Sequence, residues 1–436
     1  MERHRWNMTT LIKNGYMVTR GNQLNQVDVW IKEGIIAGIG RFDERQLSPE
    51  RIIDAKEGLI TPGLVDVHVH FREPGFEYKE TIETGSLSAA KGGYTTVCAM
   101  PNLNPVPDTP ERLERVYDII KKDSLIKVLH YAPITKELRS DALVDFKGLK
   151  DAGAFAFTND GVGVQTAGTM YLAMKEAAGL DMAIVAHTED ESLLFGGVMH
   201  KGEASERLGL PGIMSATESS QIARDVLLAK ETGVHYHVCH VSTKESVEVI
   251  RQAKKQGIHV TCEVCPHHLI LHDGDIPCDH GNYKMNPPLR AKEDRQALIE
   301  GLLDGTIDCI ATDHAPHSHE EKNQSMLEAP FGIIGSESAF QLMFTHFVET
   351  HVFTLEQVVY WMTEAPARLF KRSAGTLTIG EAADIAIFDI THDSVIEDAF
   401  ASKSNNTPFI GTKVKGETLY TLVDGQTVYV RGEEKA

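Results

Sequence analysis

The chain of 436 residues is poor in cysteine and has no long hydrophobic run. Its six cysteines show no spacing typical of a disulfide framework, which favours a reducing compartment. No apolar run approaches the ~18 residues that a membrane-spanning helix needs, and Met1–Thr10 lacks the apolar segment of a signal peptide. We therefore expect a cytoplasmic protein with no membrane partner.

Positive charge is also scarce, with 43 Lys and Arg against 62 Asp and Glu, a net charge of −19. This balance argues against nucleic acid or an anionic membrane as a partner. It does not exclude a small anionic substrate, because a few local cations can override the overall field. Cys262 and Cys265 form a C-x-x-C pair, but no second pair completes a zinc site, so we interpret both as buried strand residues.

Both ends of the chain show the alternation typical of β-strands. Val27, Val29 and Ile31 alternate with polar residues near the N-terminus, and residues 384–389 and 428–430 form apolar runs near the other end. Asn14-Gly15 predicts a turn between two short strands. We predict one small composite β-sandwich domain formed by residues 1–60 and 373–436, with two unrelated β appendages as the alternative.

Between these ends, residues 61–372 alternate short apolar runs with helical stretches. Ser215-x-x-Glu218 and Ser242-x-x-Glu245 read as capping boxes at two helix starts. A doubly wound open sheet is the competing fold, but no glycine-rich nucleotide-binding motif follows any run. Eight strand–helix units predict an α/β fold, a TIM-type (β/α)8 barrel, with strands at Leu64–His70, Thr95–Met100, Ile126–Ala132, Ala154–Thr158, Ala183–His187, Tyr236–His240, Val260–Val264 and Cys309–Asp313.

The ends of these runs are rich in side chains that bind metals. In a barrel the carboxyl ends of all strands meet on one face, so these side chains are expected to converge. Imidazole and carboxylate groups suit zinc, and also cobalt or manganese, and six of them fit a two-metal site with a bridging carboxylate. The residues at the strand ends are His68, His70, Asn102, Asp160, His187, His240 and Asp313.

Each of these residues also has an ordinary interpretation. A lone histidine at a strand end is more often a hydrogen-bonded rim residue than a ligand, and Asp160 could be a simple turn residue. His240 competes with His235 and His237 in the same run, and we choose it because it is the last before the next helix. The ordinary interpretation, however, requires that side chains able to bind a metal occur by coincidence five times at the same end of one sheet.

Seven ordered motifs carry a resemblance that covers essentially the whole chain. They are DVHVHFREPG (66–75), AMPN (99–102), TNDG (158–161), AHTED (186–190), CHVST (239–243), MNPPLR (285–290) and ATDHAPH (311–317). Together they resemble the dihydroorotase family, and more narrowly its type I bacterial form within the amidohydrolase superfamily. The resemblance implies reversible cyclisation of N-carbamoyl-L-aspartate to L-dihydroorotate, a step of de novo pyrimidine (UMP) biosynthesis.

The resemblance also implies a role for each residue. Two zinc ions per subunit are expected, the first held by His68, His70 and Asp313, and the second by His187 and His240, with Asp160 as the bridge. The substrate is expected to contact His70, Arg72, Asn102, Asn286, His317, Phe331 and Gly332, of which Arg72, Asn102 and His317 would hold its carboxylate.

Asp160 stands where many relatives bridge their metals with a carboxylated lysine. Lys150 precedes the fourth strand and Lys175 lies in the following helix, so neither is near that strand end. In the mechanism that the resemblance implies, a hydroxide bridging the two zinc ions attacks the amide, and Asp313 moves the proton as general base and then acid. The segment His317–Gly335 is long enough to be a mobile lid.

Two other functions stay open. An allantoinase or another cyclic amidase would use the same fold, although Arg72 and His317 favour a substrate that bears a carboxylate. A catalytically inactive homologue could instead serve as a partner of aspartate transcarbamoylase, against which the intact ligand set argues. As partners we expect the small-molecule substrate, a second copy in a homodimer and, in some settings, aspartate transcarbamoylase.

Overall fold

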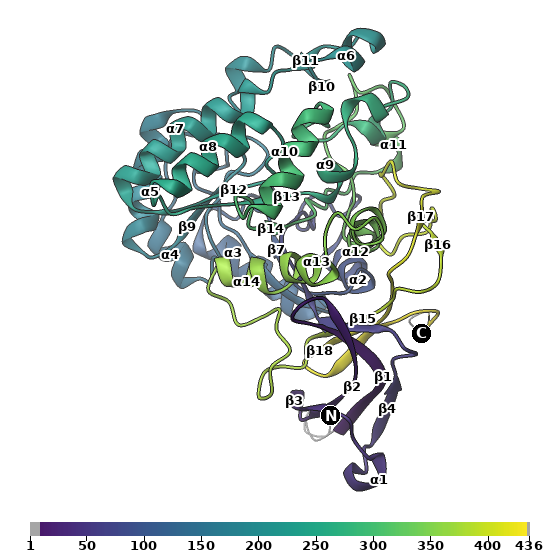
Figure 1. Cartoon of the computed structure of the whole chain (residues 1–436). Helices are drawn as coiled ribbons and strands as arrows, with labels where there is room; N and C mark the ends of the chain where they lie inside the picture. Colours follow the sequence, from purple (N-terminus) through teal and green to yellow (C-terminus); the bar gives the residue numbers. More distant parts are fainter. Residues whose placement is uncertain (1–8, 434–436) are drawn as a thin grey trace.

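The computed structural model describes residues 9–433. The first eight residues, on which most of the signal-peptide prediction rests, lie outside this range. The described chain forms a large α/β body and a smaller β body beneath it, which contains strands from both ends of the sequence (Figure 1). None of the described helices is long and apolar enough to cross a membrane.

The large body is a closed barrel of parallel strands. Backbone bridges from Ala132 to Phe157 and from Phe157 to Ile184 join its two halves on one side, and Val69 pairs with His314 on the other. The ring therefore closes as the sequence predicts. Its regular strands are β6 (Leu64–Val69), β7 (Tyr94–Ala99), β8 (Lys127–His130), β9 (Ala183–Ala186), β12 (His235–Val238), β13 (Val260–Val264) and β14 (Cys309–Ile310).

The fourth position of the barrel differs from the prediction. Residues 154–158 hold this position through backbone hydrogen bonds to His130 and Ala132 on one side and to Ala183 and Val185 on the other, but only Phe157 forms full bridges to its neighbours. The chain leaves the sheet at Asn159, whose side-chain oxygen accepts hydrogen bonds from the backbone of Ile134 and Thr135 at 2.9 and 3.2 Å. This early exit brings the next residue, Asp160, toward the barrel axis.

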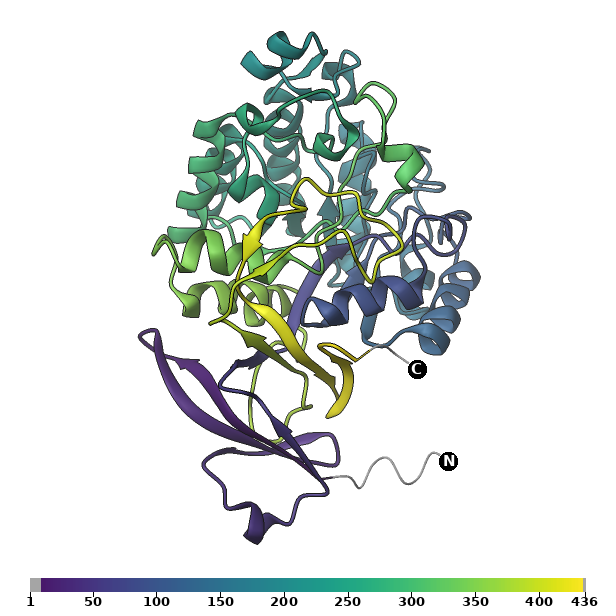
Figure 2. The same ribbon diagram turned by 90° about the vertical axis from the view of Figure 1, so that its right-hand side faces the viewer.

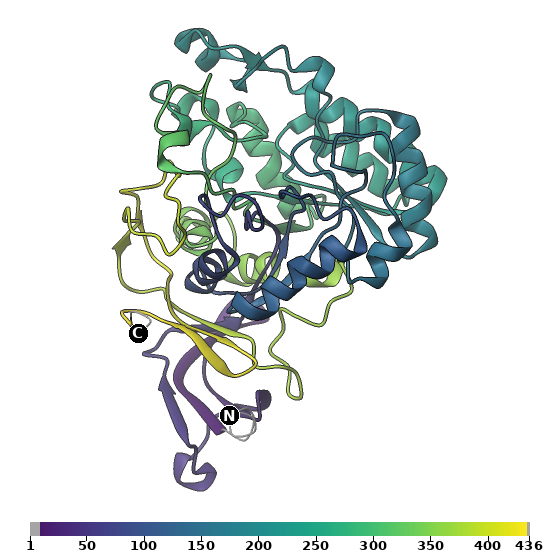
Figure 3. The ribbon, with the colours of Figure 1, turned by 180° about the vertical axis from the view of Figure 1, so that it is seen from behind.

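Helices surround the barrel (Figures 1 and 3). The helices of eight residues or more are α2 (Ile82–Lys91), α3 (Pro110–Asp123), α5 (Ala167–Gly179), α7 (Ala216–Thr232), α8 (Lys244–Lys255), α10 (Lys292–Leu303) and α13 (Leu355–Met362), and the six-residue α14 (Glu364–Leu369) follows α13 directly. Shorter elements are α1 (Glu44–Leu47), α4 (Phe146–Asp151), α6 (Glu203–Leu208), α9 (Pro266–Ile270), α11 (His319–Lys322), α12 (Ala339–Met343), β10 (Met199–His200) and β11 (Gly212–Ile213).

Neither predicted capping box forms. Ser215 has helical backbone angles and makes no side-chain cap, and α8 is capped by Thr243 rather than by Ser242. The reason is Glu218, a buried carboxylate that accepts hydrogen bonds from the hydroxyl and backbone N–H of Ser242. A carboxylate buried without donors costs more free energy than an uncapped helix end. The hydrogen bonds from Ser242 to Glu218 therefore replace the predicted capping hydrogen bonds.

The smaller body is one continuous sheet in the order β19-β18-β15-β5-β1-β2-β3, with β4 paired to β1. The antiparallel pair of β15 and β5 joins the two ends of the chain, and purple and yellow strands accordingly lie side by side in Figure 2. Side chains from both ends share one core, among them Ile12, Val29, Ile60, Ile385 and Leu422. The prediction of one composite β domain is confirmed. Its strands are β1 (Thr9–Thr19), β2 (Gln23–Lys32), β3 (Ile35–Gly40), β4 (Arg51–Asp54), β5 (Leu59–Pro62), β15 (Ile385–Asp389), β18 (Glu417–Val423) and β19 (Gln426–Val430).

The turn predicted at Asn14-Gly15 is wrong, because β1 continues through it as one strand. The pairing register with β2 shifts between Ile12 and Gly15, and Asn14 has a φ of 58°. A β-carbon on Gly15 would collide with the Ile60 side chain. The dipeptide therefore makes a bulge that lets β1 approach the core closely.

Residues between β15 and β18 leave the sheet and climb along the barrel, where the short strands β16 (Ser394–Val395) and β17 (Lys413–Val414) pair (Figures 1 and 2). Ser402 donates a hydrogen bond from its hydroxyl to Glu80 in the loop after β6. Asn406 donates to the carbonyls of Ala315 and Gly332, both at 3.1 Å. The C-terminal part of the chain thus supports the carboxyl face of the barrel.

Candidate active site

One carboxylate lies at the centre of the imidazoles at the barrel's carboxyl face. Asp160 is 3.4 Å from His68 Nε2 and 3.3 Å from His70 Nε2. It is also 3.8 Å from His187 Nδ1 and 3.7 Å from His240 Nε2. Burial works against ionisation of Asp160, but the facing imidazoles outweigh it and hold its pKa well below the usual value.

The remaining donors divide into two groups on either side of Asp160. Asp313 Oδ1 lies 3.2 Å from His68 Nε2 and 3.1 Å from His70 Nε2. On the other side, His187 Nδ1 and His240 Nε2 are 3.1 Å apart. The structure therefore brings together all six predicted ligands.

The donor set fits two divalent cations. His68 Nε2 and Asp160 Oδ1 are buried and have no hydrogen-bond partner among the described residues, although buried polar atoms are normally paired. Donor atoms of His68, His70 and Asp313 lie within 4.8 Å of one another, as do those of His68, Asp160 and His240. Imidazole nitrogens and carboxylate oxygens around a common point are the donors that zinc prefers.

Neither lysine considered as an alternative bridge reaches this site. Lys150 donates from Nζ to the carbonyl of Leu180 at 2.8 Å, at the end of α5. Lys175 lies over the ring of Tyr171 on the same helix. The carboxylate between the two groups of donors comes from Asp160.

Glu263 supports the site and was missed by the sequence analysis. It lies in β13 inside the barrel, where its two oxygens contact His68 Nδ1 at 2.6 Å and His237 Nε2 at 2.9 Å. Burial opposes its ionisation, but these imidazoles outweigh burial and lower its pKa to about 2. Such a carboxylate fixes the orientation of the ring that it contacts. The feature of the sequence that could have indicated this role is a charged residue, Glu263, within the apolar run Val260–Val264.

Arg72 and His317 lie beside the central carboxylates. Arg72 is 9% exposed as a residue. Its Nε donates to the Pro316 carbonyl at 3.1 Å, and its Nη2 lies 3.3 Å from His317 Nε2. Burial lowers the pKa of Arg72 to about 10, which leaves it cationic near neutrality. His317 Nε2 donates to the Phe331 carbonyl at 2.8 Å, so the neutral ring accepts at Nδ1 from Lys79. A cation is thus available for an anionic ligand.

Asn286 is connected to the histidine pair through Glu189, which the sequence analysis also missed. Asn286 Nδ2 donates to Glu189 Oε2 at 2.6 Å, and the other oxygen of Glu189 lies 3.8 Å from His187 Nε2. The motif AHTED (186–190) contains both His187 and Glu189, so the glutamate at its fourth position was the signal.

A cavity of about 200 Å³ opens above these groups. All predicted ligands and substrate contacts line it except His68, which is fully buried beneath. Its walls are His70, Arg72, Asn102, Asp160, Gly161, His187, His240, Asn286, Asp313, Ala315, His317, Phe331 and Gly332. A cavity of this size suits a small polar molecule rather than a polymer.

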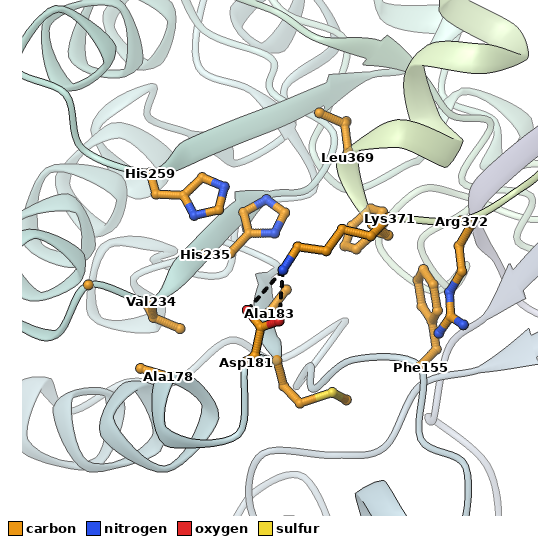
Figure 4. Close-up of a pocket in the computed structure, with 13 residues that line it drawn as sticks. Phe155, Ala178, Asp181, Ala183, Val234, His235, His259, Leu369, Lys371 and Arg372 are labelled. Atoms are coloured by element: carbon orange, nitrogen blue, oxygen red, sulfur yellow. Dashed lines mark hydrogen bonds and ion pairs between the residues drawn. The ribbon is translucent and has the colours of Figure 1, made fainter.

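A second cavity, of about 170 Å³, lies at the opposite end of the barrel, where β9 and β12 begin (Figure 4). Here His235 stacks on His259 with ring centroids 4.3 Å apart, and its Nε2 contacts the Thr261 hydroxyl at 2.7 Å. Lys371 pairs with Asp181 at 2.7 Å across the cavity. None of the predicted site residues lines this second cavity.

The barrel, with its clustered histidines and aspartates at the carboxyl face, defines a protein of the amidohydrolase class. The structure is similar to the L-hydantoinase (dihydropyrimidinase) from Arthrobacter aurescens, with a TM-score of 0.87 and 28% identity over 98% of this chain and 97% of that one. A D-hydantoinase structure matches with a TM-score of 0.84 and 26% identity, over 97% of this chain and 95% of that one.

Sequence comparison gives the particular family. A family model described as dihydro-orotase-like matches residues 57–246. Proteins named dihydroorotase from Enterococcus faecalis and Ligilactobacillus salivarius are 70% and 61% identical, over 96% and 98% of this chain and 98% and 100% of their own lengths. The chain belongs to the dihydroorotase family.

Proposed function

We propose that the protein is a dihydroorotase, which interconverts N-carbamoyl-L-aspartate and L-dihydroorotate in pyrimidine biosynthesis. The observation that carries the proposal is the placement of Asp160, within 3.3–3.8 Å of nitrogens of four imidazoles, directly below a cavity that contains Arg72. A site for metal ions and a site for a carboxylate therefore share one small cavity. Full-length relatives named dihydroorotase support the same substrate.

The residues that would hold two zinc ions are His68, His70 and Asp313 on one side and His187 and His240 on the other, with Asp160 between them. When bound, the metal ions would lower the pKa of a water molecule and polarise the amide carbonyl. The carboxylate of Asp160 is part of the encoded sequence, so assembly of the site would need no carboxylated lysine. On this ground we propose that the chain belongs to the type I branch.

The chain's own side chains would orient the substrate and move the proton. Arg72, Asn102 and His317 would hold the free carboxylate, which fixes the ring in the cavity. Asn286 and the Phe331–Gly332 backbone would contact the ring amides. Asp313 lies at the base of the cavity, where it would accept a proton from the attacking water and donate it to the departing ring nitrogen. In the cyclisation direction the same carboxylate would work in the reverse order.

The test is turnover of L-dihydroorotate by the purified protein, followed with zinc quantification on the same sample. We expect hydrolysis together with two zinc ions per chain. Allantoin is the second substrate to assay, because it lacks a carboxylate and does not need Arg72. Turnover of allantoin alone would replace the proposal with the allantoinase alternative. Protein without metal and without activity would favour the inactive homologue that partners aspartate transcarbamoylase.

Further expectations accompany this function. We propose that the barrel spans residues 61–372 and that residues 1–60 and 373–436 form the β domain. We also propose a homodimer in the cytoplasm, with aspartate transcarbamoylase as a candidate partner. Size-exclusion chromatography with light scattering, with and without that enzyme, measures both associations.

A further inference from the structure

Lys322, at the end of α11, is a lysine buried beside the proposed active site, with 2% of its surface exposed. Its Nζ donates to three backbone carbonyls, those of Lys284 and Pro330 at 2.9 Å and that of Gly332 at 2.7 Å. An ammonium group has three N–H donors, so all three are used. Within residues 9–433, no carboxylate lies within ion-pair distance of it.

Two of the three carbonyls, those of Pro330 and Gly332, come from the segment that forms one wall of the cavity. Pro330 and Gly332 flank Phe331, and Phe331 and Gly332 both line the cavity. The Gly332 N–H donates to the Lys284 carbonyl at 3.0 Å, so Lys284 and Gly332 are joined both directly and through Lys322. Gly332 has a φ of 130°, and a β-carbon there would lie 2.7 Å from that of Ala315. The backbone of this wall is therefore held in one position.

Burying this lysine without a carboxylate is unfavourable. Burial, and after it the neighbouring Lys284, lowers the pKa of Lys322 to about 7; Arg72 and Lys79 act in the same direction, and Glu321 opposes them. The neutral His317 ring also faces this region; burial lowers its pKa, Glu321 opposes this, and the cations Arg72, Lys79 and Lys322 lower the pKa further. The three carbonyl oxygens favour the ammonium form, because a neutral amine has only two N–H donors. A methionine would fill the same space without the cost of burying a charge.

We propose that Lys322 is a positioning residue for substrate capture, whose ammonium holds the backbone of Pro330–Gly332 where Phe331 and Gly332 meet the ring amides of the substrate. The inference rests on the proposed function and adds to it a residue that does not contact the substrate. Without the ammonium, the Pro330 carbonyl would lose its donor, and the carbonyls of Lys284 and Gly332 would keep only the Gly332 N–H and the Asn406 amide. The wall would then move away from its place. Binding of the ring would weaken, whereas the metal ligands and Asp313 would stay where they are.

The test compares Lys322→Met and Lys322→Gln with the wild type and with Lys292→Met, a control at an exposed position at the start of α10. Hydrogen exchange of the peptide spanning residues 328–335 reports on the wall without any substrate. We expect exchange at least about tenfold faster in Lys322→Met, and an intermediate rate in Lys322→Gln, which keeps two N–H donors. Exchange in α10 should be unchanged in all variants.

Steady-state kinetics with zinc-loaded protein supply the second readout. We expect the KM for dihydroorotate to rise about tenfold in Lys322→Met and less in Lys322→Gln, with kcat within about threefold of wild type and zinc content unchanged. A purely structural lysine would instead lower thermal stability and the active fraction, and would leave KM as it is. If Lys322→Met does not fold, Lys322→Gln carries both measurements.

The outcomes separate the two proposals. Unchanged exchange at residues 328–335 overturns the inference, and so does faster exchange with an unchanged KM. Faster exchange together with a higher KM supports it. If the wild type does not turn over dihydroorotate, the proposed function fails, and the exchange rates alone decide whether Lys322 holds this wall.

Discussion

The two ends of the barrel contain similar side chains, but these differ in whether their polar atoms have hydrogen-bond partners. At the carboxyl end, four imidazoles face Asp160, and the buried His68 Nε2 has no hydrogen-bond partner among the described residues. At the amino end, His235 stacks face to face on His259 with an interplanar angle of 9° and contacts Thr261, while Lys371 pairs with Asp181 (Figure 4). Each cavity contains histidines, a cation and a carboxylate.

A single strand illustrates the difference. β12 begins at His235 and is followed two residues after its end by His240. His235 stacks on His259 and hydrogen-bonds to Thr261. His240 Nε2, in contrast, faces Nδ1 of His187 and the carboxylate of Asp160. Metal-binding atoms that converge on one point and have no hydrogen-bond partners indicate a ligand site. The number of histidines in a cavity does not indicate one by itself. The following predictions test this distinction, beginning with the largest expected effect.

Replacing Asp313 with Asn should lower kcat by about 10²–10⁴-fold, because the amide cannot relay a proton. The fold should be intact by circular dichroism. Asp181→Asn is the matched control in the opposite cavity, and its kcat should stay within about twofold of wild type. An Asp313→Asn enzyme that keeps more than about a tenth of the wild-type rate would contradict the acid–base role.

Asp160→Ala should lose zinc from the His187–His240 side first, because two imidazoles alone make a poor zinc site. Elemental analysis of the purified variant would measure the loss. In the wild type, chelated protein should regain full activity on adding zinc alone in buffer depleted of carbon dioxide. A bicarbonate requirement for recovery would mean that a carboxylated lysine, and not Asp160, bridges the metals.

Arg72→Met should weaken substrate capture and raise KM by roughly 10–150-fold, the equivalent of ~1.5–3 kcal/mol for a charge-assisted hydrogen bond. Arg368→Met on the exposed face of α14 is the control, since within residues 9–433 Arg368 pairs only with Glu364, one turn earlier in the same helix. Normal kinetics for Arg72→Met would show that the carboxylate of the substrate binds elsewhere.

His235→Gln should alter stability and leave catalysis unchanged. Burial, and after it the neighbouring His237, lowers the pKa of His235 from 6.5 to about 3, so the unfolded chain takes up a proton below pH 6.5 that the native protein does not. Stability contributed by this neutral ring is present above pH 6.5 and declines as the pH falls toward 3. Between pH 7 and 5, the variant should therefore lose about 1–2 kcal/mol less unfolding free energy than wild type.

Urea denaturation at both pH values would measure this difference, with equal zinc in all samples. Equal losses in the two proteins would mean that His235 titrates alike in the folded and unfolded states. A changed kcat at neutral pH would mean that the two ends of the barrel are coupled.

Much of the barrel could be predicted from the sequence because its strands are continuous apolar runs and its helices are amphipathic. The predicted strand at residues 154–158 is right only in part: the segment hydrogen-bonds to both neighbouring strands but is irregular, and Asn159 ends it through hydrogen bonds to the loop at Ile134 and Thr135. The capping box at Ser215 failed for a similar reason, since Glu218 is required by Ser242 across the fold. Both errors come from side chains whose partners lie far away along the sequence.

The sequence by itself determined the order of strands, the composite β domain and the set of side chains at the strand ends, because periodicity and local chemistry are properties of neighbouring residues. The tertiary structure alone decided which of those side chains meet. It oriented His68 through Glu263, joined His187 to Asn286 through Glu189, and brought Asn406 from the C-terminal region to the wall at Gly332. These contacts join positions that are up to 195 residues apart in sequence, and no local pattern records them. Burial makes them obligatory, because a polar group without water must find its partner wherever the fold places one.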